Sequence, residues 1–188
     1  MSVSVHAMHL RFASQLLAVG GVIACPTEAV WGLSCDPQNP DAVNRLLAIK
    51  GRPVSKGLIL VAADEQQLAS LLTDLNDDER QQLSASWPGP NTWLIPHRGL
   101  VKPWVHGEHD TVAVRVTDHP VVAALCLAWG SPLVSTSANP AGKEPPKAQA
   151  EIYSYFGKTL DYIVPGATGD LDRPTQIRDL ASGEVLRV

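Results

Sequence analysis

Residues 48–60 read AIKGRPVSKGLIL, and in this stretch a cationic, turn-forming segment separates two apolar runs. The first run closes residues 39–50, a segment that we expect to be a helix. Asp41 in its first turn and Lys50 in its last complement the helix dipole. The second run continues to residue 62 and predicts a short buried strand. The stretch is therefore a helix-to-strand connection of the kind found in α/β proteins.

The cations of this connection allow two interpretations. If the chain leaves the helix in an extended loop, Lys50 and Arg52 face the same way, and Lys56 follows nearby. Lys and Arg at this density can neutralise several phosphate charges, while Gly51 permits close backbone approach and Pro53 stiffens the exit. The alternative is a Lys that complements the helix dipole and is followed by exposed charges.

Predicted strands and helices alternate outward from this stretch along the whole chain of 188 residues. The segments that decide the class are strands at 21–26, 57–62, 111–116 and 132–138, a helix at 119–130, and a terminal hairpin at 175–188. No repeat and no long linker interrupts them, and 45% of the residues are hydrophobic. The pattern predicts one α/β domain with a mixed sheet and flanking helices.

A second polar constellation follows the predicted strand at 132–138. Residues 134–142 read VSTSANPAG and bring Ser135, Thr136, Ser137 and Asn139 to a strand end. Their hydroxyl and amide groups can hold phosphate, ribose or carboxylate without carrying charge. The alternative is a polar turn in which Ser and Asn satisfy the backbone.

Two further strands carry polar candidates. Thr27 and Glu28 follow the strand at 21–26 and could contact a ligand, or Thr27 could only cap a turn. In the alternating strand TVAVRV, Thr111 and Arg115 share one face. Arg115 is therefore either exposed or lines a cleft, where it could pair with a carboxylate.

Several classes of protein are not indicated. The net charge of −4 does not suit a strongly basic nucleic-acid binder, although a local basic patch would be compatible with it. No Walker motif, GxGxxG or metal-ligand spacing occurs, and His106 and His109 are interpreted as part of a solvated loop. The three cysteines form no CxxC pair and are expected to be buried free thiols, which suits the cytoplasm. No window has the length or hydrophobicity of a membrane span.

Six motifs occur in one order along nearly the whole chain: PTEAVWGLSCDP (26–37), IKGRPVSKGLIL (49–60), WPGPNTW (87–93), VAVRVTDHP (112–120), STSANPAG (135–142) and PTQIRDLASGEVLR (174–187). Together they resemble the YrdC-like family of L-threonylcarbamoyladenylate synthases, most closely its short bacterial form. The resemblance implies an open, twisted α/β sheet, related to the YrdC/RibB-like fold, with a concave, positively charged surface. It also implies that residues 1–188 are a single domain with no additional C-terminal domain.

The resemblance further implies a nucleotidyltransferase reaction. The family forms threonylcarbamoyl-AMP and pyrophosphate from L-threonine, bicarbonate or CO2, and ATP, with Mg2+ accompanying the nucleotide. The product serves the threonylcarbamoyladenosine modification of tRNA, through a separate transferase complex. An alternative is a module that binds tRNA or double-stranded RNA in RNA or ribosome maturation.

Site residues follow from the resemblance, motif by motif. Lys50 and Arg52 are expected to be catalytic and to bind the triphosphate. The remaining ATP contacts would be Lys56, Thr111, Ser137, Asn139, Lys147 and Arg187. The threonine contacts would be Thr27, Arg115, Ser137 and Thr175, and no protein metal ligand is expected.

The chain departs from the family pattern in two places. Longer relatives have a histidine near the threonine where this chain has Val61, so that contact must be supplied differently or be missing. Thr175 stands where Ser is usual, and the hydroxyl is retained.

Overall fold

The computed structural model describes residues 6–187, except for the side chain of Arg187. Its strands are β1 (Ile23–Pro26), β2 (Trp31–Ser34), β3 (Ile59–Ala62), β4 (Asn91–Pro96), β5 (Thr111–Val116), β6 (Leu133–Ser137), β7 (Tyr162–Ile163), β8 (Gln176–Asp179) and β9 (Val185–Arg187). Its α-helices are α1 (Ala7–Ala18), α2 (Pro40–Lys50), α3 (Ala69–Leu72), α4 (Asp77–Ser84), α5 (Pro103–His106), α6 (Pro120–Trp129) and α7 (Gln149–Phe156). Two 3-10 turns, η1 (Val54–Lys56) and η2 (Glu65–Leu68), complete the description.

The described strands form one mixed sheet in the order β7-β1-β2-β6-β3-β5-β4-β8-β9. Three neighbouring pairs are parallel, β1 with β7, β3 with β5, and β4 with β8. The remaining pairs are antiparallel. The fold is therefore the mixed α/β sheet with flanking helices that the sequence predicts.

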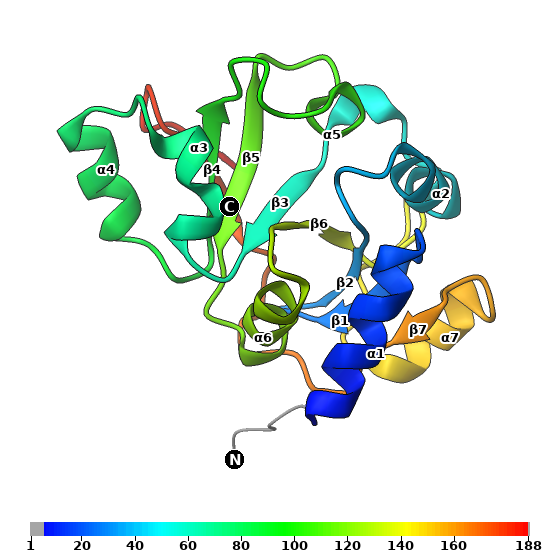
Figure 1. Ribbon diagram of the computed structural model, residues 1–188. Coiled ribbons are helices and arrows are strands. Elements are labelled where there is room, and N and C mark those ends of the chain that lie inside the picture. Colours follow the sequence, from blue (N-terminus) through cyan, green and yellow to red (C-terminus); the bar gives the residue numbers. More distant parts are fainter. Residues whose placement is uncertain (1–5, 188) are drawn as a thin grey trace.

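The two faces of the sheet are covered unequally. On one face, Leu60, Val114 and Val134 belong to a large buried cluster that includes residues of α2, α3, α4, α5 and α7. On the other face, Val61 and Leu133 pack in a smaller cluster with α1 and α6, which lie side by side in Figure 1. Side chains alternate between the two faces along a strand, so every strand also presents residues on this second face. The helices α1 and α6 cover only part of this face, and the rest of it is open.

The helix of the opening stretch begins and ends where its sequence predicts. The side chain of Asn39 caps α2 by accepting hydrogen bonds from the backbone of Asp41 and Ala42. Gly51 ends the helix in the left-handed conformation, at φ 62°. The chain then forms η1 rather than a fully extended loop, so the geometry expected for residues 50–56 is wrong in this detail.

Other local predictions have mixed outcomes. The helix at 119–130 is confirmed as α6, and Cys25, Cys35 and Cys126 are buried free thiols as predicted. The small polar residues of 27–40 favour a loop, yet residues 31–34 form β2, because they pair with both β1 and β6. Within residues 6–187, no helix has the length and hydrophobicity needed to cross a bilayer.

Gly107 allows α5 to approach η1. Its φ is 67°, and a Cβ there would lie 2.5 Å from the carbonyl oxygen of Ser55. Gly99 has a similar φ of 77°, but a Cβ there would meet nothing within 4 Å. The two glycines therefore share a positive φ, but only at Gly107 would an added Cβ clash with the neighbouring backbone.

We expect Gly107→Ala to lower the free energy of unfolding by about 3 kcal/mol, and Gly99→Ala by only about 1 kcal/mol. Both variants place an alanine at a positive φ, but only the first also displaces η1. Urea unfolding of the two variants beside the parent protein measures the difference. Equal losses would show that the approach of α5 to η1 is not tightly packed.

Candidate functional site

A pocket of about 400 Å³ lies on the sheet face that α1 and α6 leave uncovered. Its floor is a row of residues from four adjacent strands, Ser135, Ile59, Ala113 and Leu94, which are paired in register across the sheet. The volume lies in the range of small-ligand sites. The small side chains of Ala113 and Ser135 help to leave this space open.

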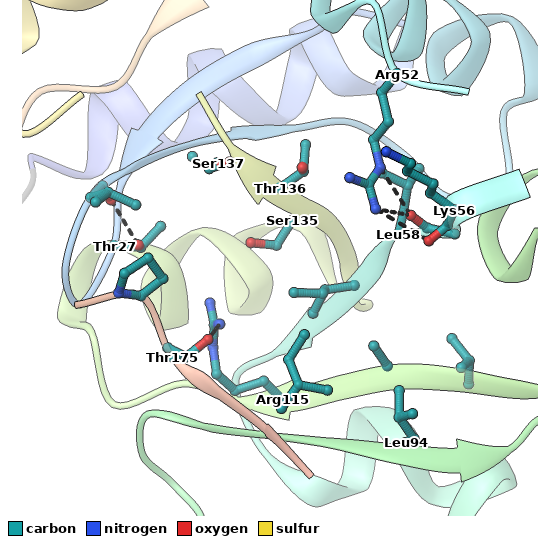
Figure 2. Close-up of a pocket in the computed structure, with 18 of the residues that line it drawn as sticks. Thr27, Arg52, Lys56, Leu58, Leu94, Arg115, Ser135, Thr136, Ser137 and Thr175 are labelled. Atoms are coloured by element: carbon teal, nitrogen blue, oxygen red, sulfur yellow. Dashed lines mark hydrogen bonds between the residues drawn. The ribbon is translucent and has the colours of Figure 1, made fainter. Parts of the chain in front are cut away.

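Many of the predicted site residues line this pocket, although they are far apart in the sequence. Figure 2 shows several of them around one space, with Arg52 and Lys56 at one end and Arg115, Thr27 and Thr175 at the other. The predicted residues that the pocket gathers are Thr27, Arg52, Lys56, Thr111, Arg115, Ser137 and Thr175.

The Arg52 end of the pocket is cationic. The Nε and Nη2 atoms of Arg52 donate to the carbonyl oxygen of Gly57, at 3.2 and 2.9 Å, so the side chain folds back over η1. Burial lowers the pKa of Arg52. Among the described residues, no carboxylate forms an ion pair with Lys50, Arg52 or Lys56. Their positive charge is therefore available to an anion.

Lys50 is buried beneath the loop that follows β6. Its Nζ donates to the carbonyl oxygens of Ser137 and Asn139, the latter at 2.9 Å. Burial, and secondly the charge of Arg52, lowers the pKa of Lys50 from 10.5 to about 8. The side chain thus ties the last turn of α2 to the second polar constellation. Lys50 is not among the residues that line the pocket.

Two other predicted ATP contacts, Asn139 and Lys147, are also absent from the pocket lining. The amide nitrogen of Asn139 donates to the carbonyl oxygen of Lys143 at 2.6 Å and closes its own loop. Lys147 is exposed, and its Nζ donates to the carbonyl oxygen of Asp172 at 3.2 Å. Arg187 is the last residue of β9, and its side chain lies outside the described part of the structure.

The Arg115 end of the pocket is built around a buried guanidinium group. Nη1 of Arg115 donates to Oγ1 of Thr175 at 2.9 Å, and its Nε lies 3.3 Å from Oε1 of Glu28. Of the two alternatives for Arg115, the structure shows the cleft-lining one. The hydroxyl of Thr27 donates to the carbonyl oxygen of Val30 at 2.7 Å while Thr27 also lines the pocket.

Val61 is paired in register with Arg115 on β5 but does not line the pocket. It is fully buried against α6, in the cluster that contains Cys25 and Val121. The valine of this chain therefore does not contribute to the pocket.

The sequence interpretation missed His106 and His109. The half-buried His106 and the exposed His109 both line the pocket near Gly57, so the interpretation as a purely solvated loop is wrong. His106 also stacks on His97, with ring centroids 3.9 Å apart. Their spacing in the sequence carries no signal of this placement, because it depends on α5 packing against η1.

The donor set of the pocket bears on Mg2+. Hydroxyl groups and cations line it, and no Asp or Glu is part of the lining in the described chain. Nor do the described residues contain a group of three or more His, Cys, Asp or Glu that could hold a metal ion. Such a pocket suits Mg2+ that arrives on nucleotide phosphates rather than in a protein cage.

The fold and the pocket together define a mixed-sheet α/β protein with a pocket on the open sheet face that is lined by cationic and hydroxyl-bearing side chains. The Sua5/YciO/YrdC family model, described as Telomere recombination, matches residues 15–188. This chain belongs to that family, which confirms the resemblance of its motifs.

Curated relatives match along almost their whole length. The threonylcarbamoyl-AMP synthase of Halorhodospira halophila is 56% identical over 178 residues, which are 95% of this chain and 93% of that protein. The protein of the same name from Pseudomonas entomophila is 52% identical over 97% of this chain and 98% of its own.

Solved structures of the family have the same fold. P. abyssi Sua5 in complex with L-threonine matches with a TM-score of 0.85 and 30% identity over 92% of this chain. The match covers 51% of the P. abyssi protein, so this chain spans about half of its length. E. coli YciO matches with a TM-score of 0.86 and 26% identity, over 97% of this chain and 89% of that protein.

The lowered pKa of Lys50 predicts a specific pH dependence of stability. Between about pH 8 and 10.5 the unfolded chain binds a proton at Lys50 that the folded chain has released. Stability therefore rises with pH through this window, and below about pH 8 both states are protonated. Relative to Lys50→Met, we expect the parent protein to gain about 3 kcal/mol across the window.

Urea unfolding of both proteins at pH 7.5 and at intervals up to about pH 10.5 measures this gain. Taking the difference between the two proteins cancels the other titrating groups. A difference that does not change with pH would contradict the lowered pKa.

Proposed function

We propose that this chain is an L-threonylcarbamoyl-AMP synthase, which forms threonylcarbamoyl-AMP and pyrophosphate from L-threonine, bicarbonate or CO2, and ATP. The observation that carries the proposal is a pocket with two unlike ends. The cations at one end have no carboxylate partner in the described chain, and the other end holds a buried arginine flanked by hydroxyl groups. The names of the curated relatives and the threonine complex of P. abyssi Sua5 support it.

The Arg52 end suits the nucleotide. Arg52 and Lys56 line the pocket and would bind phosphate oxygens, and Thr111 and Ser137 supply neutral polar contacts. Lys50 has one N–H beyond the two that hold carbonyl oxygens, so its ammonium would act on the phosphates from beneath the loop. Asn139, Lys147 and Arg187 would contact outer parts of the nucleotide.

The Arg115 end suits the amino acid. The guanidinium group would receive the carboxylate of threonine. Thr27, Ser137 and Thr175 line the same region and would contact the remaining polar groups of the substrate. With Val61 buried, these hydroxyls complete the region in place of a histidine.

The chemistry requires two anions to approach each other. The threonine amine adds to CO2 and loses a proton to give a carbamate. A carbamate oxygen then attacks the α-phosphorus, and the bond to pyrophosphate breaks. Charge neutralisation and positioning dominate such a step, so Arg52, Lys56 and Lys50 would stabilise negative charge while Arg115 fixes the amino acid. Mg2+, when bound with ATP, would supply further neutralisation of the phosphates.

The wider setting follows from this activity. We assign residues 1–188 to one YrdC-like domain that acts in the cytoplasm. Its product would pass to a separate threonylcarbamoyl transferase complex that modifies tRNA. Direct contact with tRNA or double-stranded RNA would be tested by the salt dependence of binding, which is steep for contacts to phosphates.

The activity is tested by pyrophosphate release from ATP, which we expect to require both L-threonine and bicarbonate. Arg52→Ala should lower kcat/KM about 100-fold or more, because it removes a charged group that faces the reacting phosphates. The exposed Arg11→Ala on α1 removes the same charge outside this pocket and should leave the rate unchanged.

Two results would count against the proposal. Folded parent protein that releases no pyrophosphate with all three substrates would refute the activity. Equal rates for Arg52→Ala and Arg11→Ala would refute the role of the cationic end, even if the activity is present.

A further inference from the structure

Glu28 is a buried carboxylate that the proposed chemistry does not use. Its side chain is 4% exposed, and it does not line the pocket. Oε1 accepts a hydrogen bond of 2.6 Å from Thr117, and Oε2 has no hydrogen-bond partner among the described residues. Burying a carboxylate costs free energy unless it is paired, so its place here must be sustained by its partners.

The main partner is Arg115, which is 3% exposed. Oε1 of Glu28 lies 3.3 Å from Nε of Arg115, as an ion pair without the alignment of a hydrogen bond. Nη1 of the same guanidinium donates to Thr175. A guanidinium group is planar, so holding two of its nitrogens fixes the directions of the remaining N–H groups. Figure 2 shows Arg115 reaching from β5 into the space near Thr175 and Ser135.

The backbone around Glu28 holds the other wall of the same region. The carbonyl oxygen of Glu28 accepts from the backbone of Leu171 at 3.2 Å, and that of Thr27 accepts from Gly169 at 2.9 Å. A Cβ on Gly169 would lie 2.6 Å from the Glu28 carbonyl oxygen, so the two segments are in close contact. The segment that leads to Thr175 is thereby fastened to residues 27 and 28.

We infer that Glu28 is a positioning residue, which orients Arg115 so that its free N–H groups meet the carboxylate of the amino-acid substrate. Thr117 assists by fixing Oε1, and the backbone of His119 donates to the Thr117 hydroxyl at 3.1 Å to hold it in turn. This inference rests on the proposed function and adds a residue that does not itself touch the substrate.

The test is L-threonine binding to Glu28→Gln, measured by calorimetry without ATP, together with steady-state KM values for both substrates. The amide keeps the shape but loses the charge that anchors Arg115. We expect threonine affinity to fall roughly 10- to 100-fold, the range for losing a charged partner, and KM for ATP to stay within about twofold. A merely structural role would weaken both substrates together.

Three further variants sharpen the test. Glu28→Asp keeps the charge and should recover part of the threonine affinity. Asp118→Asn removes one exposed negative charge two positions after β5 and should change neither affinity. If circular dichroism shows that Glu28→Gln does not fold, Thr117→Val is tested in its place. This variant retains the ion pair between Glu28 and Arg115 but removes the hydrogen bond to Oε1 of Glu28. We expect it to raise the KM for threonine and not that for ATP.

Unchanged threonine affinity in folded Glu28→Gln would overturn the inference. If Glu28→Gln does not fold, an unchanged threonine KM in Thr117→Val would overturn it. So would equal losses for threonine and ATP. The proposed function fails separately, if the parent protein itself neither binds threonine nor releases pyrophosphate.

Discussion

The hydrogen bonds from the buried ammonium of Lys50 to the carbonyl oxygens of Ser137 and Asn139 join the two halves of the site. They fasten the end of α2 to the loop after β6, although 87 residues separate Lys50 from Ser137. Together with the hydrogen bond of 2.8 Å from the backbone of Ala141 to the carbonyl oxygen of Lys50, they help to hold the connection that carries Arg52 beside the hydroxyl groups of β6. The lowered pKa of Lys50 reflects the burial that this position requires.

Charge compensation distinguishes the two ends of the pocket. Arg115 has Glu28 beside it, whereas Arg52 and Lys56 have no carboxylate partner in the described chain. A zwitterionic amino acid carries no net charge and suits the compensated end. A triphosphate carries several negative charges and suits the uncompensated end, so charge gives a physical reason for the place proposed for each substrate.

Sequence reasoning succeeded where local chemistry decides the outcome. The helix at 39–50, which forms as α2, and the apolar run of β3 are local features, and both were predicted from the residues. It failed where pairing or packing decides. β2 forms because two strands flank it, and His106 reaches the pocket only because Gly107 lets α5 approach η1.

The sequence by itself determined the α/β class, the family, and most of the polar groups that now line one pocket. Only the tertiary structure decided which of these polar groups line the pocket and which lie beneath or behind it. It placed Arg52 and Lys56 in the lining, Lys50 beneath the loop and Glu28 behind Arg115, because burial and partner choice depend on which strands become neighbours. A sequence pattern specifies which face a side chain takes along its own strand, but not which residues from other strands will meet it there.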